Sequence, residues 1–231
     1  MGTNTLLSRE LQQDALFEME SQRSIDWGKP LTESYAPQSL DGLLGLEKQK
    51  RILKRFAENP KAGAAILLEG DTGTGKTTAG ILLAKAIGAE LHLLASQTAT
   101  VENLRATIDR CWYVPMVGDK GWHLVQIDEA EKISPQAMLA LLSVFDGTAC
   151  PPRTIFVLTC NSTETFPDKF LGRCLRLPKF NTYGASETIK ARLSAIWRER
   201  SGSSAELDVS KAQTGSVRAA YQWLEVELLS A

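Results

Sequence analysis

Several classes of protein are excluded by what this sequence lacks. Its four cysteines (Cys111, Cys150, Cys160 and Cys174) show no CxxC spacing, which favours reduced thiols over a disulfide framework or a zinc cluster. No apolar run approaches the roughly 18 residues of a membrane helix, and the first residues lack the apolar segment of a signal peptide. Acids and bases nearly cancel, at 27 against 26, so any basic surface must be local. We expect a cytoplasmic protein with no membrane partner.

The hydrophobic pattern divides the chain into three parts, with predicted boundaries 1–34, 35–180 and 181–231. The first part is polar. Residues 1–27 suit either a solvated helix or tail, or a helix that docks on a partner. Residues 28–42 are predicted to form an extended segment. The second part alternates strands, at 64–69, 89–95, 122–128, 153–161 and 174–180, with helices, at 46–59, 76–89, 100–113 and 134–147. The third has helices only, at 185–200, 207–213 and 215–230. Apolar strands that alternate with helices indicate an α/β fold with a doubly wound parallel sheet.

The stretch "GDTGTGKTT", residues 70–78, follows the first predicted strand and opens a helix. Residues 70–77 match G-x-x-x-x-G-K-[ST], in which backbone N–H groups and a helix N-terminus surround phosphate oxygens. Lys76 is expected to reach the β- and γ-phosphates, and the Thr77 hydroxyl to bind Mg²⁺. We therefore predict an ATP site made by Asp71, Thr72, Gly73, Thr74, Gly75, Lys76, Thr77 and Thr78.

Two adjacent carboxylates end the third strand, in "HLVQIDEAEK". Asp128 is expected to hold the Mg²⁺ ion together with Thr77. Glu129 should point the other way, toward the γ-phosphate, where it can orient and deprotonate the attacking water. A surface acidic turn is the alternative. Because P-loop kinases of small molecules usually do not need this second carboxylate, the pair favours hydrolysis over phosphate transfer.

Two further polar residues occupy strand ends. Asn161 ends "RTIFVLTCN", where its amide could contact the γ-phosphate and the lytic water; an ordinary strand-to-loop asparagine is the alternative. Arg173 precedes the last strand, in "FLGRCLRLPKF". Taken alone, Arg173 suits surface charge.

From about Tyr35 to Leu228 the chain resembles the AAA+ ATPases, and within them the sliding-clamp loader subunits of the replication-factor-C and bacterial gamma-subunit kind. "YAPQSLDGLLGLEKQK" resembles the loaders' Tyr-x-Pro motif, which implies that Tyr35, Leu44 and Gly45 border the adenine. "IDEAEKISPQAMLALL" resembles their hydrolysis motif. "TGSVRAAYQWL" resembles the sensor-2 helix of the family's small helical lid domain, which implies that Arg218 bends over the γ-phosphate.

The resemblance also implies partners. "LTCNSTETFPDKFLGRCLRL" resembles sensor-1 followed by the Ser-Arg-Cys box, so Arg173 would act in trans on the ATP of a neighbouring subunit in a homo- or hetero-oligomer. "LLASQTATVENLRATI" resembles the segment that leads into a helix lining the DNA channel. Arg105 matches a position that touches the DNA backbone, and Arg110 lies on the same helix; a solvated helix face is the alternative reading of both.

The chain departs from the loaders at several points. Gly172 replaces the serine before the arginine, "QAMLALL" carries no basic residue, the loop before Trp122 has no cysteine cluster, and no collar domain is expected in a sequence that ends at Ala231. A clamp-loader-like ATPase acting on DNA or on a DNA-bound protein is the first reading. Another AAA+ remodeller, such as a helicase loader, transposition regulator or protein-remodelling activator, is the second. A nucleotide-bound structural subunit is the third, and Glu129 argues against it.

Overall fold

A single parallel sheet organises the computed structural model, which describes residues 29–147, 149–202 and 206–230. The strand order is β2-β3-β4-β1-β5. The strands are β1 (Ala65–Glu69), β2 (Ala89–Ala95), β3 (Trp122–Asp128), β4 (Thr154–Cys160) and β5 (Cys174–Arg176). All of the pairings between them are parallel, which confirms the α/β fold predicted from the alternating pattern.

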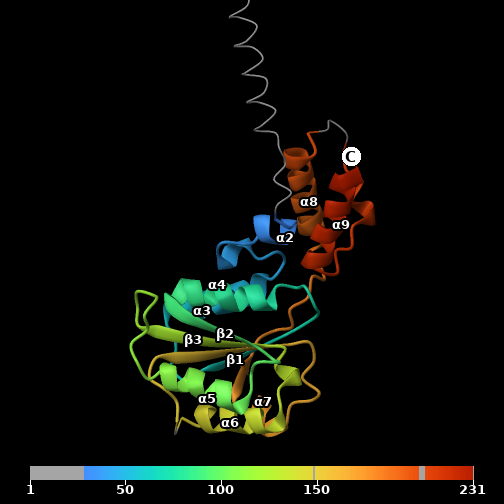
Figure 1. Ribbon diagram of the computed structural model, residues 1–231. Coiled ribbons are helices and arrows are strands. Elements are labelled where there is room, and N and C mark those ends of the chain that lie inside the picture. The colour runs from blue at the N-terminus through green and yellow to red at the C-terminus, as the bar shows by residue number, and fades with distance from the viewer. Residues whose placement is uncertain (1–28, 148, 203–205, 231) are drawn as a thin grey trace, which may run out of the picture.

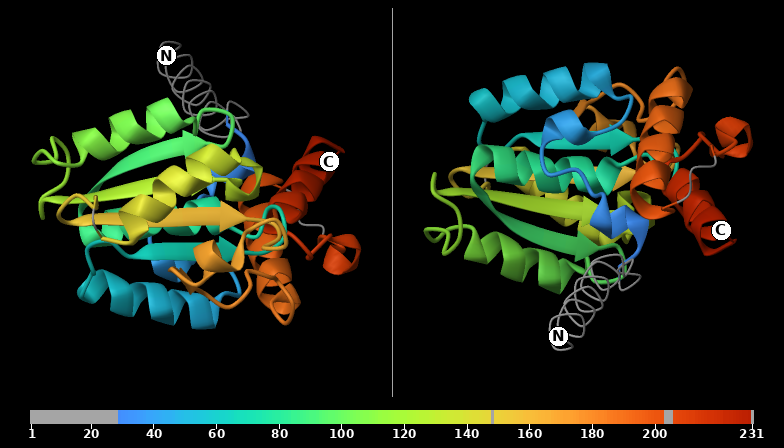
Figure 2. Two further views of the ribbon diagram at one scale, coloured as in Figure 1. Left: turned by 90° about the horizontal axis from the view of Figure 1, so that it is seen from below. Right: turned by 90° about the horizontal axis from the view of Figure 1, so that it is seen from above.

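Helices cover both faces of this sheet (Figures 1 and 2). The helices are α2 (Leu31–Ser34), α3 (Glu47–Glu58), α4 (Lys76–Ile87), α5 (Val101–Arg110), α6 (Pro135–Phe145), α7 (Asp168–Leu171), α8 (Ser186–Arg200) and α9 (Val217–Ser230), with 3-10 turns η1 (Leu40–Gly42), η2 (Ala130–Lys132) and η3 (Val209–Lys211). One apolar cluster packs α3 and α4 on one face, and another packs α5 and α6 on the other. Both faces are covered, so β1 and β4 are buried along their whole length and are apolar except for Glu69, Thr154 and Thr159.

The helices α8 and α9 pack together beside the sheet and have a core of their own (Figure 1). This third cluster includes Ile189, Leu193 and Leu224, which are fully buried. Leu31 of α2 joins it, so a residue from before the first predicted boundary packs on the C-terminal helices. The boundaries 1–34, 35–180 and 181–231 stay a prediction.

The register of the parallel strands brings three loops together. Glu69 pairs with Cys160, and Ile127 pairs with Leu158. The carboxyl ends of β1, β3 and β4 therefore lie side by side at one edge of the sheet. The residues that follow these three strands meet there, as expected for a doubly wound fold.

Two local expectations were wrong. Residues 28–42 are not simply extended, because α2 and η1 form within them, α2 directly after Pro30. Residues 207–213 form only the turn η3, where the Asp208 side chain accepts the Ser210 N–H in place of a longer helix. Strand β2 lies at the sheet edge and is partly exposed, with Leu93 at 51%. The helix considered within residues 1–27 lies outside the described residues.

No helix in the described parts of the chain is long and apolar enough to cross a membrane.

Candidate functional site

The P-loop turns sharply at two glycines between β1 and α4. Gly73 and Gly75 have φ of +77° and +96°, which residues with a β-carbon rarely adopt. Gly75 is the N-cap of α4, so the free N–H groups of that helix face the loop. Thr74 closes the turn, because its hydroxyl donates to the Asp71 carbonyl at 2.7 Å. This geometry leaves room for an anion at the helix N-terminus.

Lys76 is 8% exposed and is held by acceptors from two strand ends. Its Nζ donates to the carbonyls of Gly70 at 2.6 Å and Asp71 at 2.8 Å, and to Oδ1 of Asn161 at 3.2 Å. Burial lowers the pKa of Lys76 from its ordinary value. The ammonium is thus partly desolvated at the sheet edge, where an anion would interact with it strongly.

Asp128 and Thr77 are joined by a residue that sequence reasoning missed. Gln126 Nε2 donates to Asp128 Oδ1 at 2.9 Å and to the Thr77 carbonyl at 3.1 Å. The Thr159 hydroxyl also donates to Asp128 Oδ1, at 3.0 Å. Gly80 makes room for the bridge, since a β-carbon there would lie 2.2 Å from Gln126 Oε1. The bridge ties the Asp128 carboxylate to the backbone of Thr77, and a carboxylate and a threonine hydroxyl are the hard oxygen donors that suit Mg²⁺.

Glu129 stands in a strained backbone conformation. Its φ of 52° and ψ of 47° are left-handed, and its N–H donates to the Thr159 hydroxyl at 3.2 Å. Its carboxylate is half-exposed and pairs with Lys132 Nζ at 2.8 Å. That hydrogen bond holds the pKa of Glu129 below its ordinary value, so the carboxylate is ionised at neutral pH.

Asn161 is oriented by a second residue that the sequence reading missed, Glu131. Glu131 Oε1 accepts from the Asn161 side-chain amide at 3.0 Å and from its backbone N–H at 3.1 Å. These two bonds turn Asn161 Oδ1 toward Lys76 and toward the Thr72 hydroxyl, at 3.4 Å. Glu131 Oε2 is buried without a hydrogen-bond partner among the described residues. The "DEAEK" spacing was the available signal, because Glu131 lies two residues after Glu129.

The start of α9 lies directly against the P-loop. The Arg218 N–H donates to the Gly73 carbonyl at 3.3 Å. A β-carbon at Gly73 would lie 2.2 Å from Ser216 Oγ and 2.9 Å from Arg218 Cβ. The start of α9 therefore contacts the phosphate loop, and the Cβ atom of Arg218 lies next to Gly73.

One cavity of about 780 Å³ joins these elements. Its walls include all three residues expected at the adenine, part of the P-loop and the start of α9: Tyr35, Leu44, Gly45, Gly73, Thr74, Gly75, Thr78, Val217, Arg218 and Tyr221. The Tyr35 ring lies under the guanidinium groups of Arg192 and Arg200, at 5.4 and 5.2 Å, and its hydroxyl accepts from Arg200 Nε at 3.0 Å. A bound nucleotide would contact both the sheet edge and the C-terminal helices.

Arg173 lies at the other end of the sheet. Cys174 pairs with Ala65, the first residue of β1, about 16 Å along the strand from the P-loop. The Arg173 guanidinium pairs with Asp146 and donates to the Lys169 carbonyl at 2.8 Å. The structure therefore separates Arg173 from the P-loop of its own chain.

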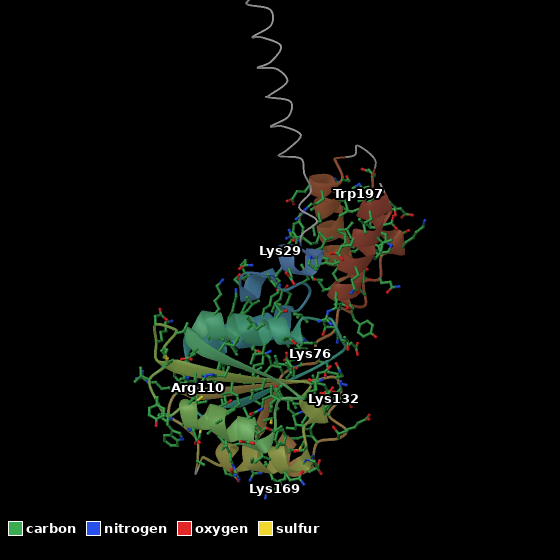
Figure 3. The ribbon with its side chains drawn as sticks, in the orientation of Figure 1. Lys29, Lys76, Arg110, Lys132, Lys169 and Trp197 are labelled. Atoms are coloured by element: carbon green, nitrogen blue, oxygen red, sulfur yellow. The ribbon has the colours of Figure 1, made fainter. Side chains whose placement is uncertain are left out.

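The two arginines proposed for DNA are exposed on α5. Lys76 and Lys132 lie at one end of the sheet and Arg110 at the other (Figure 3). Arg105 lies in the middle of α5, five residues before Arg110.

Comparison with known proteins agrees with this geometry. The family model "ATPase family associated with various cellular activities (AAA)" matches residues 66–182. A replication factor C small subunit of Methanosphaera stadtmanae is 31% identical over 179 residues, which cover 74% of this chain and 53% of the relative. That of Thermofilum pendens is 30% identical over 190 residues, with 74% and 58% covered. The chain thus spans about half the length of such relatives.

Solved structures show the same fold. A RuvB of Thermotoga maritima superposes with a TM-score of 0.65 at 17% identity, covering 84% of this chain and 67% of that one. A DNA polymerase III gamma subunit-related protein of the same organism gives 0.54 at 16% identity, with 78% and 58% covered. Since the matched family model spans half of the sequence, from β1 through the residues after β5, the chain belongs to the AAA family of ATPases.

Proposed function

We propose that this chain binds Mg²⁺-ATP in the cavity between the sheet edge and the C-terminal helices and hydrolyses it within an oligomer. The observation that carries the proposal is the cavity itself, which is lined by the P-loop, by the predicted adenine residues and by Arg218. Mononucleotide sites of P-loop proteins combine these parts. Residues 35–180 would form the nucleotide-binding domain, and residues 181–231 a lid over it.

The side chains at the sheet edge suit distinct roles in this reaction. Lys76 would leave its carbonyl partners for the phosphates, and Arg218 would approach the γ-phosphate from α9. Thr77 and Asp128 would hold Mg²⁺, which neutralises charge on the phosphate oxygens. Glu129, once released from Lys132, would take a proton from the attacking water. Asn161 would orient that water, because Glu131 holds its amide in place.

The position of Arg173 supports catalysis between subunits. It lies about 16 Å along the sheet from its own P-loop, so it would reach only the ATP of a neighbour. In one arrangement the salt bridge between Arg173 and Asp146 would break before the guanidinium reaches the neighbouring ATP. In the other, the salt bridge would stay intact and hold the guanidinium at the subunit interface. An arginine supplied in this way stabilises charge on the transferring phosphoryl group.

The relatives suggest the biological action. Replication factor C small subunits are the similar proteins at about 30% identity, so we infer a clamp-loader-like action on DNA or on a DNA-bound protein in the cytoplasm. The exposed Arg105 and Arg110 would contact the phosphate backbone. A different AAA+ remodelling activity is the alternative.

A single set of turnover measurements tests the proposal. ATP hydrolysis is measured with and without a primed DNA duplex, over a range of protein concentrations, with Lys76→Ala as the blank for contaminating ATPase. We expect Mg²⁺-dependent turnover that rises with DNA and with concentration. DNA should stimulate Arg105→Ala and Arg110→Ala less than the unmodified chain. An ATP hydrolysis rate that is the same with and without DNA would favour the other remodelling activity. The absence of ATP hydrolysis would contradict the proposal that the chain is an enzyme.

A further inference from the structure

The two histidines of the sequence face each other in the structure, together with a cysteine. His92 Nε2 lies 3.0 Å from His123 Nδ1. The nearest ligand atoms of His92, Cys111 and His123 all lie within 4.8 Å of one another. The three residues are 9%, 1% and 2% exposed. Nothing in the proposed ATPase reaction uses this cluster.

Three different elements build the cluster. Strands β2 and β3 are neighbours, with Glu90 opposite His123, so His92 is two residues further along and on the same face. Cys111 is the C-cap of α5, the helix that covers this face. Residues about 20 and 12 positions apart thus converge without the close spacing that identifies metal sites in a sequence.

The donor set and its surroundings suit a zinc-class ion. Imidazole nitrogen and thiolate sulfur bind Zn²⁺, at about 2.0–2.1 and 2.3 Å, and do not suit Mg²⁺ or Ca²⁺. Two nitrogens on one tetrahedral ion lie about 3.3 Å apart, close to the 3.0 Å between the rings here. His123 Nε2 lies 2.8 Å from the Tyr113 carbonyl, which accepts its N–H and leaves Nδ1 facing the cluster.

The alternative is a hydrogen-bonded histidine pair beside an inert thiol. A simple histidine pair needs no third group, whereas here the Cys111 sulfur lies within 4.8 Å of a ring nitrogen of each histidine.

We propose that His92, Cys111 and His123 form a binding site for one Zn²⁺-class ion, with water in the fourth position. The site fastens the loop after α5 to the sheet. His123 precedes Asp128 by five residues on β3, so the ion would lie about 16 Å from the expected Mg²⁺ position, separate from the nucleotide site.

Metal titration of the full chain, stripped of metal, tests this site. Cobalt(II) should bind at one equivalent and give the near-ultraviolet charge-transfer band of a thiolate ligand, and added Zn²⁺ should abolish that band. Cys111→Ser should lose the band, and His123→Gln should weaken metal binding at least about tenfold. The matched control is Cys150→Ser, which changes a thiol outside the cluster and should leave the titration unchanged.

A second measurement depends on no variant. Zinc-edge X-ray absorption of the wild-type chain should show one sulfur at about 2.3 Å and nitrogen or oxygen neighbours at about 2.0–2.1 Å. Binding below one equivalent, a zinc shell without sulfur, or a thiolate band that persists in a folded Cys111→Ser variant would each overturn the proposal. The histidines would then be a simple hydrogen-bonded pair.

Discussion

Lys76 Nζ and Asn161 Oδ1 lie 3.2 Å apart, although 85 residues separate them in the sequence. The contact joins the helix after β1 to the end of β4, with both polar groups at the sheet edge. A bound phosphate would lie next to both the Lys76 ammonium and the Asn161 amide, so the two residues are expected to act on the same part of the nucleotide.

Lys76→Ala should abolish nucleotide binding, because the lysine supplies the main positive charge opposite the β- and γ-phosphates. A titration with a fluorescent ATP analogue measures this directly. Lys85→Ala is the matched control, since Lys85 is exposed in the last turn of the same helix. Unchanged affinity in Lys76→Ala would mean that the nucleotide binds elsewhere.

Glu129→Gln should keep ATP affinity and lower turnover about a hundredfold or more, because an amide cannot accept the proton of water. Single-turnover hydrolysis measures the chemical step alone. Glu102→Gln, an exposed change in the first turn of α5, should have no effect. Turnover retained in Glu129→Gln would require a different base.

Glu131→Ala should lower kcat at least about tenfold with little change in KM, because Asn161 would lose two hydrogen bonds that orient it. Glu131→Gln should recover part of the loss, since its Oε1 can still accept both N–H groups. A general folding defect would instead give no rescue and a lower melting temperature in both variants.

Gly73→Ala should weaken nucleotide binding about tenfold or more. The new methyl group would strain a left-handed residue and strike Ser216 and Arg218, so α9 could not approach the P-loop. Isothermal titration calorimetry measures the affinity. Gly215→Ala is the control in the same segment, because a β-carbon there meets nothing within 4 Å. Equal effects of the two changes would argue against the contact.

Arg173→Ala should lower turnover about a thousandfold or more while ATP affinity stays near normal, if the guanidinium acts on a neighbour. Mixing this variant with Lys76→Ala should restore some activity, because the Lys76→Ala chain lends its arginine to an intact P-loop. Dilution should lower turnover per subunit. Arg55→Ala, an exposed change on α3, is the control.

Activity that is flat on dilution and absent from the mixture would leave Arg173 as part of a local salt bridge with Asp146. The expected sharing of a site between subunits would then be wrong.

The residues that could be predicted from sequence are those whose chemistry depends on near neighbours. Two glycines with left-handed φ, a lysine and a threonine within one turn make the P-loop, so residues 70–77 identified it. Apolar strands alternating with helices predicted the parallel sheet, because a strand that is buried on both faces has an apolar sequence that can be recognised without its neighbours. Asp128, Glu129 and Asn161 stood out for the same reason, as polar residues that end apolar strands.

Only the tertiary structure decided which of these strand ends meet. The order β2-β3-β4-β1-β5 places β4 beside β1, so Asn161 at the end of β4 lies against Lys76, whereas Arg173 precedes β5 and lies at the opposite end of the parallel strands. The hydrogen bond between Glu131 and Asn161 and the contact between His92 and His123 depend on the register of neighbouring strands. Hydrogen bonds between strands join residues tens of positions apart, and no local spacing in the chain records that pairing.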